Sequence, residues 1–145
     1  MLDNSNFTGS WQIGIIVKDV QKAISGLAQI GIGPFAPLKA PPTVRWEENG
    51  KPIEVKLKMQ FSSNGSLEIE LIEPISQCMQ KEFLDTKGEG IQHLSYFVKD
   101  IDREVRRLSG LGYKLVQRGW RANSGGYAFF DTRDSIGFML EIIQR

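Results

Sequence analysis

Residues 12–32 read QIGIIVKDVQKAISGLAQIGI and residues 93–113 read HLSYFVKDIDREVRRLSGLGY. The two stretches align without a gap at an offset of 81 residues, and five of the 21 positions are identical. Each stretch begins with a short run of β-branched or aromatic residues and continues with apolar residues at helical spacing. The chain therefore contains an internal repeat, and each repeat unit starts with a strand followed by a helix.

The boundaries of both predicted helices carry the expected signals. Asp19 and Asp100 stand at the N-cap positions, where a carboxylate accepts hydrogen bonds from free backbone N–H groups. Gly31 and Gly112 stand just past the last apolar position, where a helix commonly ends on a glycine. The two helices are therefore predicted to begin and end at equivalent residues.

Short strand patterns separated by turns follow each helix. Asn49-Gly50 and Asn64-Gly65 are hairpin signals between alternating runs. The predicted strands are 43–48, 53–61 and 67–73 in the first half, and 113–117, 127–131 and 138–144 in the second.

Each half thus reads βαβββ, and we expect an α+β fold in a single domain over residues 1–145. Module one covers about 9–74, a linker helix about 75–88, and module two about 90–145. An open sheet from one module cannot bury its face alone. We therefore expect the two sheets to face each other across a pseudo-twofold axis.

Composition excludes several classes of protein. Lys plus Arg is 18 and Asp plus Glu is 17, so no basic surface for nucleic acid is expected. No run approaches 18 apolar residues, and the polar N-terminal segment lacks the apolar core of a signal peptide. Cys78 is the only cysteine, which excludes an intramolecular disulfide. We expect a cytoplasmic protein that contacts neither nucleic acid nor membrane.

Two glutamates interrupt apolar strands at matching places in the repeat. Glu141 lies in FMLEIIQ, where a buried carboxylate is costly unless it is paired or binds a metal. Glu70 lies in LEIELIE, the last strand of the first half, and shares its face with Glu68. The alternatives are an ion pair or an exposed edge for Glu141 and a solvated face for Glu70.

His93 is the only histidine, and its counterpart in the repeat is Gln12. Each is followed two residues later by a small residue, Gly14 or Ser95, which we interpret as space for a ligand over the side chain. A histidine at the start of a strand is also common as a purely structural residue. The repeat nevertheless brings one imidazole, one amide oxygen and two carboxylates together. Such a mixed set suits a divalent first-row metal ion, with the ligands Gln12, Glu70, His93 and Glu141.

Other polar residues allow two interpretations. Glu54 shares a strand face with Lys56, Lys58 and Gln60, a pattern typical of a solvated face. Arg118, Trp120 and Arg121, together with Arg45 and Trp46, could bind an anion at the mouth of a site or belong to ordinary surface.

The segments QIGIIVKDV, LEIELIEP, GEGIQHLSYFVKDID and GFMLEIIQ resemble the vicinal oxygen chelate superfamily, which includes glyoxalases, ring-cleaving dioxygenases and antibiotic-resistance proteins. Among its branches the chain is most similar to methylmalonyl-CoA epimerases. The resemblance implies paired βαβββ modules around a divalent metal (Co, Ni, Mn, Zn or Fe), and a homodimer. It places the ligands at Gln12, Glu70, His93 and Glu141, and a second catalytic carboxylate at Glu54.

The implied reaction is epimerisation of a 2-methyl-branched acyl-CoA. The α proton leaves, the metal stabilises the enolate, and Glu54 and Glu141 serve as bases on opposite faces. The chain departs from the epimerase pattern at Gln12, where the epimerases carry His, and at Gln92-His93, where they carry two consecutive histidines.

A glyoxalase I-like lactoylglutathione lyase, which has a similar ligand set and can work with one carboxylate, therefore remains an alternative. A non-catalytic binding or resistance protein is another alternative. An iron dioxygenase is disfavoured because it needs two histidines.

Overall fold

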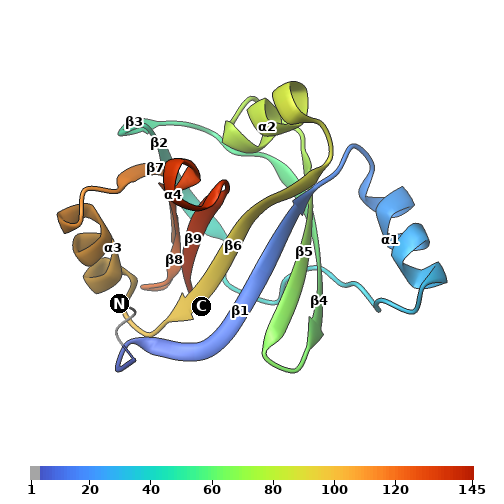
Figure 1. The fold of residues 1–145 in the computed structure, drawn as a ribbon, viewed down its shortest axis with the longest axis horizontal. Coiled ribbons are helices and arrows are strands. Elements are labelled where there is room, and N and C mark those ends of the chain that lie inside the picture. The colour runs from blue at the N-terminus through green and yellow to red at the C-terminus, as the bar shows by residue number, and fades with distance from the viewer. Residues whose placement is uncertain (1–3) are drawn as a thin grey trace.

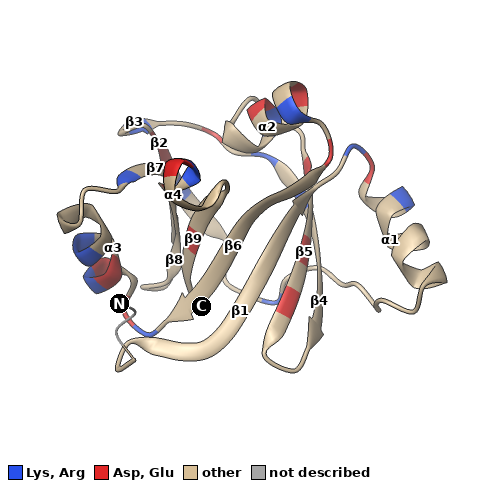
Figure 2. Ribbon diagram, in the orientation of Figure 1, with Lys and Arg blue, Asp and Glu red and all other residues tan. Residues whose placement is uncertain are grey.

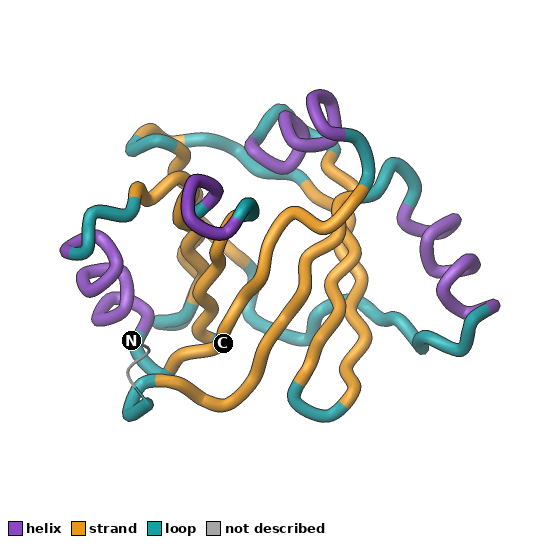
Figure 3. Tube along the Cα trace, in the orientation of Figure 1, coloured by secondary structure: helices purple, strands orange, loops and turns teal. Residues whose placement is uncertain are grey.

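The computed structural model describes residues 4–145, which form one curved sheet flanked by helices (Figure 1, Figure 3). The first three residues of the polar N-terminal segment lie outside the described part. The strands are β1 (Phe7–Ile16), β2 (Thr43–Glu48), β3 (Lys51–Pro52), β4 (Leu57–Asn64), β5 (Leu67–Pro74), β6 (Gly90–Val98), β7 (Lys114–Arg121), β8 (Gly126–Asp131) and β9 (Met139–Gln144). The helices are α1 (Val20–Gln29), α2 (Met79–Lys87), α3 (Ile101–Gly110) and α4 (Arg133–Ile136).

The strands are hydrogen-bonded in the order β3-β2-β7-β8-β9-β6-β1-β5-β4. In the middle, β1 and β6 run antiparallel and join the two modules. On either side, β1 lies parallel to β5 and β6 lies parallel to β9, which is the expected internal symmetry. The α+β fold of paired modules is thus confirmed. The two halves face each other because one continuous sheet bends, not because two separate sheets stack.

The helix boundaries agree with the sequence prediction. The Asp19 carboxylate accepts hydrogen bonds from the backbone N–H groups of Gln21 and Lys22, and Asp100 accepts one from Arg103. Gly31 and Gly112 follow the helices with φ of 84° and 90°, values that favour glycine.

The long helices cover the outer surface of the sheet. Leu108 of α3 packs with Tyr96, Phe130 and Ile142 from the strands beneath it. On the other half, α1 packs with a smaller cluster that includes Leu71 of β5. The inner, concave face is thereby left free for the polar side chains described below.

The linker between the modules forms a shorter helix than predicted. The helix expected over 75–88 begins at Met79, and Gly88 ends it with φ of 84°. Ile75 precedes the helix and is exposed, whereas Cys78 and Met79 are buried.

One strand pairs differently from the symmetric expectation. β2 forms over the predicted residues, but it pairs with β7 of the second module. The Pro-rich stretch 34–42 lacks several backbone donors and carries the chain away from its own sheet, touching it only at the isolated bridge Ala36–Phe61. After the Asn49–Gly50 turn only β3 pairs with β2. Residues 53–56 have no regular structure, so the strand predicted at 53–61 begins at Leu57.

Within residues 4–145, no helix combines the length and apolar character needed to cross a bilayer.

Gly14 provides a test of the central strand pairing. It lies opposite His93 in the β1–β6 register, and a Cβ atom there would be 1.9 Å from His93 Cε1. Gly14→Ala is therefore expected to lower the free energy of unfolding by about 2–3 kcal/mol. Gly26→Ala is the matched control, because a Cβ on this α1 residue meets nothing within 4 Å. It should instead raise stability by about 0.5–1 kcal/mol. If urea denaturation gave Gly14→Ala the same free energy of unfolding as the unaltered protein, the pairing of Gly14 with His93 would be contradicted.

Candidate metal centre

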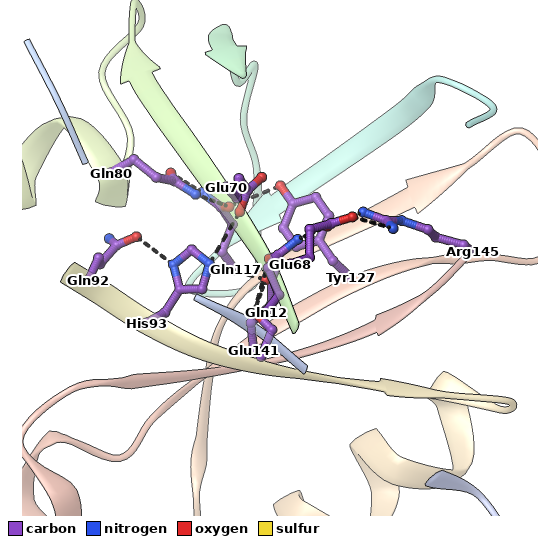
Figure 4. Close-up of polar contacts among 11 residues, drawn as sticks. Gln12, Glu68, Glu70, Gln80, Gln92, His93, Gln117, Tyr127, Glu141 and Arg145 are labelled. Atoms are coloured by element: carbon purple, nitrogen blue, oxygen red, sulfur yellow. Dashed lines mark hydrogen bonds and ion pairs between the residues drawn. The ribbon is translucent and has the colours of Figure 1, made fainter. Parts of the chain in front are cut away.

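His93 lies at the centre of the concave face. Its side chain is 0% exposed, and the edge of Phe129 packs against the ring with centroids 4.8 Å apart. Nδ1 lies 3.1 Å from the Gln92 Oε1, an oxygen that can only accept, so Nδ1 carries a hydrogen. This contact turns Nε2 toward the interior, as Figure 4 shows.

Two carboxylates meet that nitrogen. His93 Nε2 lies 3.3 Å from Glu70 Oε2 and 3.3 Å from Glu141 Oε2. Neither contact has hydrogen-bond geometry, so Nε2 has no hydrogen-bond partner among residues 4–145. Glu70 and Glu141 are 7% and 6% exposed, so the solvated-face and edge interpretations of these two glutamates are wrong. The acidic positions on β5 and β9 are visible within the sheet in Figure 2.

The charges of these three groups are strongly linked. Burial by itself lowers the pKa of His93, but the negative charges of Glu141 and Glu70 outweigh it and raise the pKa to about 9. Burial is the main cause that raises the pKa of Glu70, and repulsion from Glu141 adds to it. Without a metal, a proton on His93 thus balances one of the two carboxylate charges.

Gln12, the predicted fourth ligand, lies next to this group. It is buried beside the centre, and its Oε1 lies 3.2 Å from the Ser95 hydroxyl. Ser95 donates a short hydrogen bond of 2.5 Å to Glu141. The register explains the arrangement, because Gln12 lies opposite Ser95 and Gly14 lies opposite His93. The space next to Gly14 is occupied by the His93 ring itself, and Ser95 acts as a bridge, so these small residues do not leave room for a ligand as expected.

The residues fit a divalent metal ion. One ligand atom from each of Glu70, His93 and Glu141 lies within 4.8 Å of the other two. Bonds of roughly 2.0–2.2 Å to one ion keep its ligands within about 4.4 Å of each other, and both His93–carboxylate distances meet that limit. An unpartnered imidazole nitrogen facing two carboxylates is a typical donor set for such an ion.

Glu68 fixes the orientation of Gln12, a role that the sequence did not reveal. The Gln12 Nε2 donates to Glu68 Oε1 at 2.6 Å, which turns the amide oxygen toward the centre. Arg145 donates to both oxygens of Glu68, at 2.6 and 3.0 Å. Glu68 is buried rather than solvated, and the C-terminal arginine compensates its charge.

Glu54 lies elsewhere. Its side chain is 73% exposed and pairs with Lys56 at 3.3 Å on the irregular segment 53–56. The neighbouring Val55, not Glu54, lines the cavity next to the metal centre. The catalytic role of Glu54 stays a prediction, and its position gives that role no support.

A cavity of about 370 Å³ opens onto the centre. Gln12, Glu70 and Glu141 form part of its wall, and Arg121 and Arg145 also reach it. The remaining wall is mostly apolar and comes from both modules and from the Pro-rich stretch: Leu38, Pro41, Pro42, Trp46, Val55, Leu57, Met59, Phe61, Ile72, Tyr127, Phe129 and Ile143. Of the arginines predicted to bind an anion, Arg121 lines the cavity. Arg118 instead pairs with Asp102.

A buried amide network adjoins the cavity and contributes Gln80 and Tyr127 to its wall. Gln80 and Gln117 exchange two hydrogen bonds of 3.0 and 3.1 Å, and Tyr127 donates to Gln117 at 2.9 Å. The Glu48 carboxylate accepts from Gln117 and from the backbone N–H of Met79 at the start of α2. These contacts attach β2 and α2 to the second module. Its four side chains lie singly in four separate segments, β2, α2, β7 and β8, so the sequence gave no signal for this network.

Comparison with known proteins agrees with this arrangement. The family model of the Glyoxalase/Bleomycin resistance protein/Dioxygenase superfamily matches residues 11–130, and the chain belongs to this family. The uncharacterized protein YqjC of Bacillus subtilis (strain 168) is 29% identical over 94 residues, which cover 63% of this chain and 67% of that protein.

Solved structures of the same fold include two epimerases. Methylmalonyl-CoA epimerase from Mycobacterium tuberculosis is 26% identical, with a TM-score of 0.67 over 99% of this chain and 92% of the other. A Streptomyces coelicolor methylmalonyl-CoA epimerase variant in complex with 2-nitronate-propionyl-CoA is 16% identical, with a TM-score of 0.62 over 92% and 94%. The second similarity supports the fold alone.

Metal binding can be measured directly. The protein dialysed against Co²⁺ or Ni²⁺ should retain close to one equivalent, and His93→Ala should lose most of it because the single nitrogen donor is gone. Elemental analysis of the dialysed proteins gives the stoichiometry. Retention below about a tenth of an equivalent by the unaltered protein would contradict the metal centre.

Glu68→Gln tests the orientation of the Gln12 amide. A neutral amide at position 68 no longer fixes which end of Gln12 faces the centre, so affinity for Mn²⁺ should fall about 10–100-fold. Electron paramagnetic resonance titration measures free Mn²⁺, and Glu54→Gln, which removes an exposed carboxylate, is the matched control. Unchanged affinity in Glu68→Gln would show that Glu68 does not position a ligand.

Proposed function

We propose that this chain is a metal-dependent epimerase of a 2-methyl-branched acyl-CoA thioester, similar to methylmalonyl-CoA. The main support is the buried Glu70–His93–Glu141 group. Its two carboxylates line a cavity that is large enough for a small acyl group. Family membership and the 26% identity to an epimerase over nearly the whole chain support it. The proposed ligands are Gln12, Glu70, His93 and Glu141.

The reaction requires a place for negative charge and a base. A divalent ion in the centre would act as a Lewis acid and stabilise the charge that develops on the thioester oxygen as the α proton leaves. Glu141 is the proposed base, because its carboxylate lines the cavity and the Ser95 hydroxyl holds it in one orientation. The apolar wall excludes water, which protects the carbanion from unspecific protonation.

Epimerisation also needs proton return on the opposite face. Glu54 is the proposed second base from the family resemblance, but only Glu70 and Glu141 are carboxylates among the described residues that line the cavity. This observation favours, as a second candidate, a glyoxalase I-like lyase in which one carboxylate moves the proton between adjacent carbons. The homodimer also remains a prediction.

Deuterium exchange distinguishes these functions. The metal-loaded protein incubated with (2R)- or (2S)-methylmalonyl-CoA in D₂O should introduce one deuterium at the α carbon, as measured by mass spectrometry. Glu141→Gln should abolish the exchange because it removes the base and a ligand. No uptake by the unaltered protein would contradict the epimerase, and turnover of the methylglyoxal–glutathione hemithioacetal would support the lyase.

The same assay decides the role of Glu54. If Glu54 returns the proton, Glu54→Gln should suppress inversion while leaving part of the exchange at the remaining face. Equal inversion by Glu54→Gln and the unaltered protein would show that Glu54 belongs to the solvated surface that its exposure indicates.

A further inference from the structure

Arg121 is a buried cation in the wall of the cavity. It is the last residue of β7, 8% exposed, and reaches the same cavity as Glu70 and Glu141. Its preceding neighbour on the same strand face, Gly119, opposes Tyr127 in the β7–β8 pair. The guanidinium is thus presented to the cavity from a strand that is hydrogen-bonded to β2 and β8, not from a loop.

Arg121 forms no ion pair within residues 4–145. Its Nη1 donates to the backbone carbonyl of Gln144 at 2.9 Å, and no carboxylate lies within ion-pair distance of it. The other buried arginine, Arg118, pairs with Asp102, and Arg145 pairs with Glu68. Burial and repulsion from Arg145 lower the pKa of Arg121, and the more distant charges of Glu141 and Glu70 oppose this shift only in part. A buried guanidinium without an anionic partner is costly, so an anion is expected beside it.

Charge balance points to the source of that anion. Glu70 and Glu141 balance a divalent ion, and Glu68 balances Arg145 at 2.6 Å. His93 is neutral when its Nε2 binds a metal. One positive charge, that of Arg121, therefore remains on the wall of the loaded cavity. A substrate with one carboxylate near its reacting carbon would neutralise it, whereas a neutral acyl group would leave it buried and unpaired.

We propose that Arg121 binds a carboxylate of the acyl group and makes the protein selective for acyl-CoA thioesters that carry this second carboxylate. This inference rests on the proposed function and assigns a specificity-determining residue to it. The planar guanidinium suits a carboxylate because two parallel N–H groups can bind its two oxygens. Val55, Leu57 and Phe129 supply the apolar surface for the methyl branch.

A pair of thioesters of nearly equal size tests the proposal. Methylmalonyl-CoA carries a carboxylate where isobutyryl-CoA carries a methyl group. Calorimetric titration of the Co²⁺-loaded protein should give at least about tenfold tighter binding of methylmalonyl-CoA. Arg121→Met should remove that preference and change isobutyryl-CoA binding less than about twofold. Arg121→Lys should recover part of the preference, because it keeps the charge and loses the paired N–H groups.

Arg45→Met is the matched control, since Arg45 is exposed and stacks on Trp120 outside the cavity. It should leave both affinities unchanged. The proposal is overturned if Arg121→Met weakens both thioesters equally or weakens neither, or if the unaltered protein does not distinguish them. If Arg121→Met does not fold, Arg121→Lys replaces it: a reduced preference for methylmalonyl-CoA supports the proposal, and an unchanged preference overturns it.

Failure of the epimerase proposal gives a different result. Selective, Arg121-dependent binding of methylmalonyl-CoA without deuterium exchange would contradict the catalytic function and retain Arg121 as a carboxylate-binding residue.

Discussion

The antiparallel pairing of β1 with β6 is the contact on which the rest of the structure depends. It places Gln12 opposite Ser95 and Gly14 opposite His93, so the pairing is symmetric about the equivalent residues Ile13 and Leu94. The parallel neighbours then add Glu70 beside Gly14 and Glu141 beside Ser95. Because the proposed ligands come from four strands of one sheet, their spacing is fixed by backbone hydrogen bonds rather than by loops. A one-residue slip of β1 against β6 would turn the residues of one module to the opposite face from those of the other.

Burial of acidic groups is costly, and nearby cations compensate their charge. In the metal-free protein the proton on His93 balances one of the two central carboxylates, Arg121 attracts both of them, and Arg145 balances Glu68. A divalent ion must therefore displace the His93 proton, which links metal binding to proton release. Arg121 is the cation in the cavity wall that forms no ion pair within residues 4–145. We interpret its charge as part of substrate recognition.

The sequence predicted the features that repeat. Five identities at a fixed offset paired Gln12 with His93, and the equal order of strands after each helix paired Glu70 with Glu141, because equivalent strands of a symmetric sheet carry equivalent side chains. It did not predict where the symmetry ends. The crossing of β2 to β7 depends on the free edge of a strand far along the chain, and the exposure of Glu54 follows from that crossing. The burial of Glu68 depends on Arg145, 77 residues away, which no local pattern reveals.

We propose that residues from both modules bind one divalent ion through a single imidazole and several oxygens. X-ray absorption spectroscopy of the Co²⁺-loaded protein at the cobalt edge measures this coordination. The spectrum should contain the scattering pattern of one imidazole in a shell of oxygen ligands, and that pattern should be missing in His93→Ala. A spectrum of the unaltered protein equal to that of hydrated cobalt, without imidazole scattering, would contradict the metal centre.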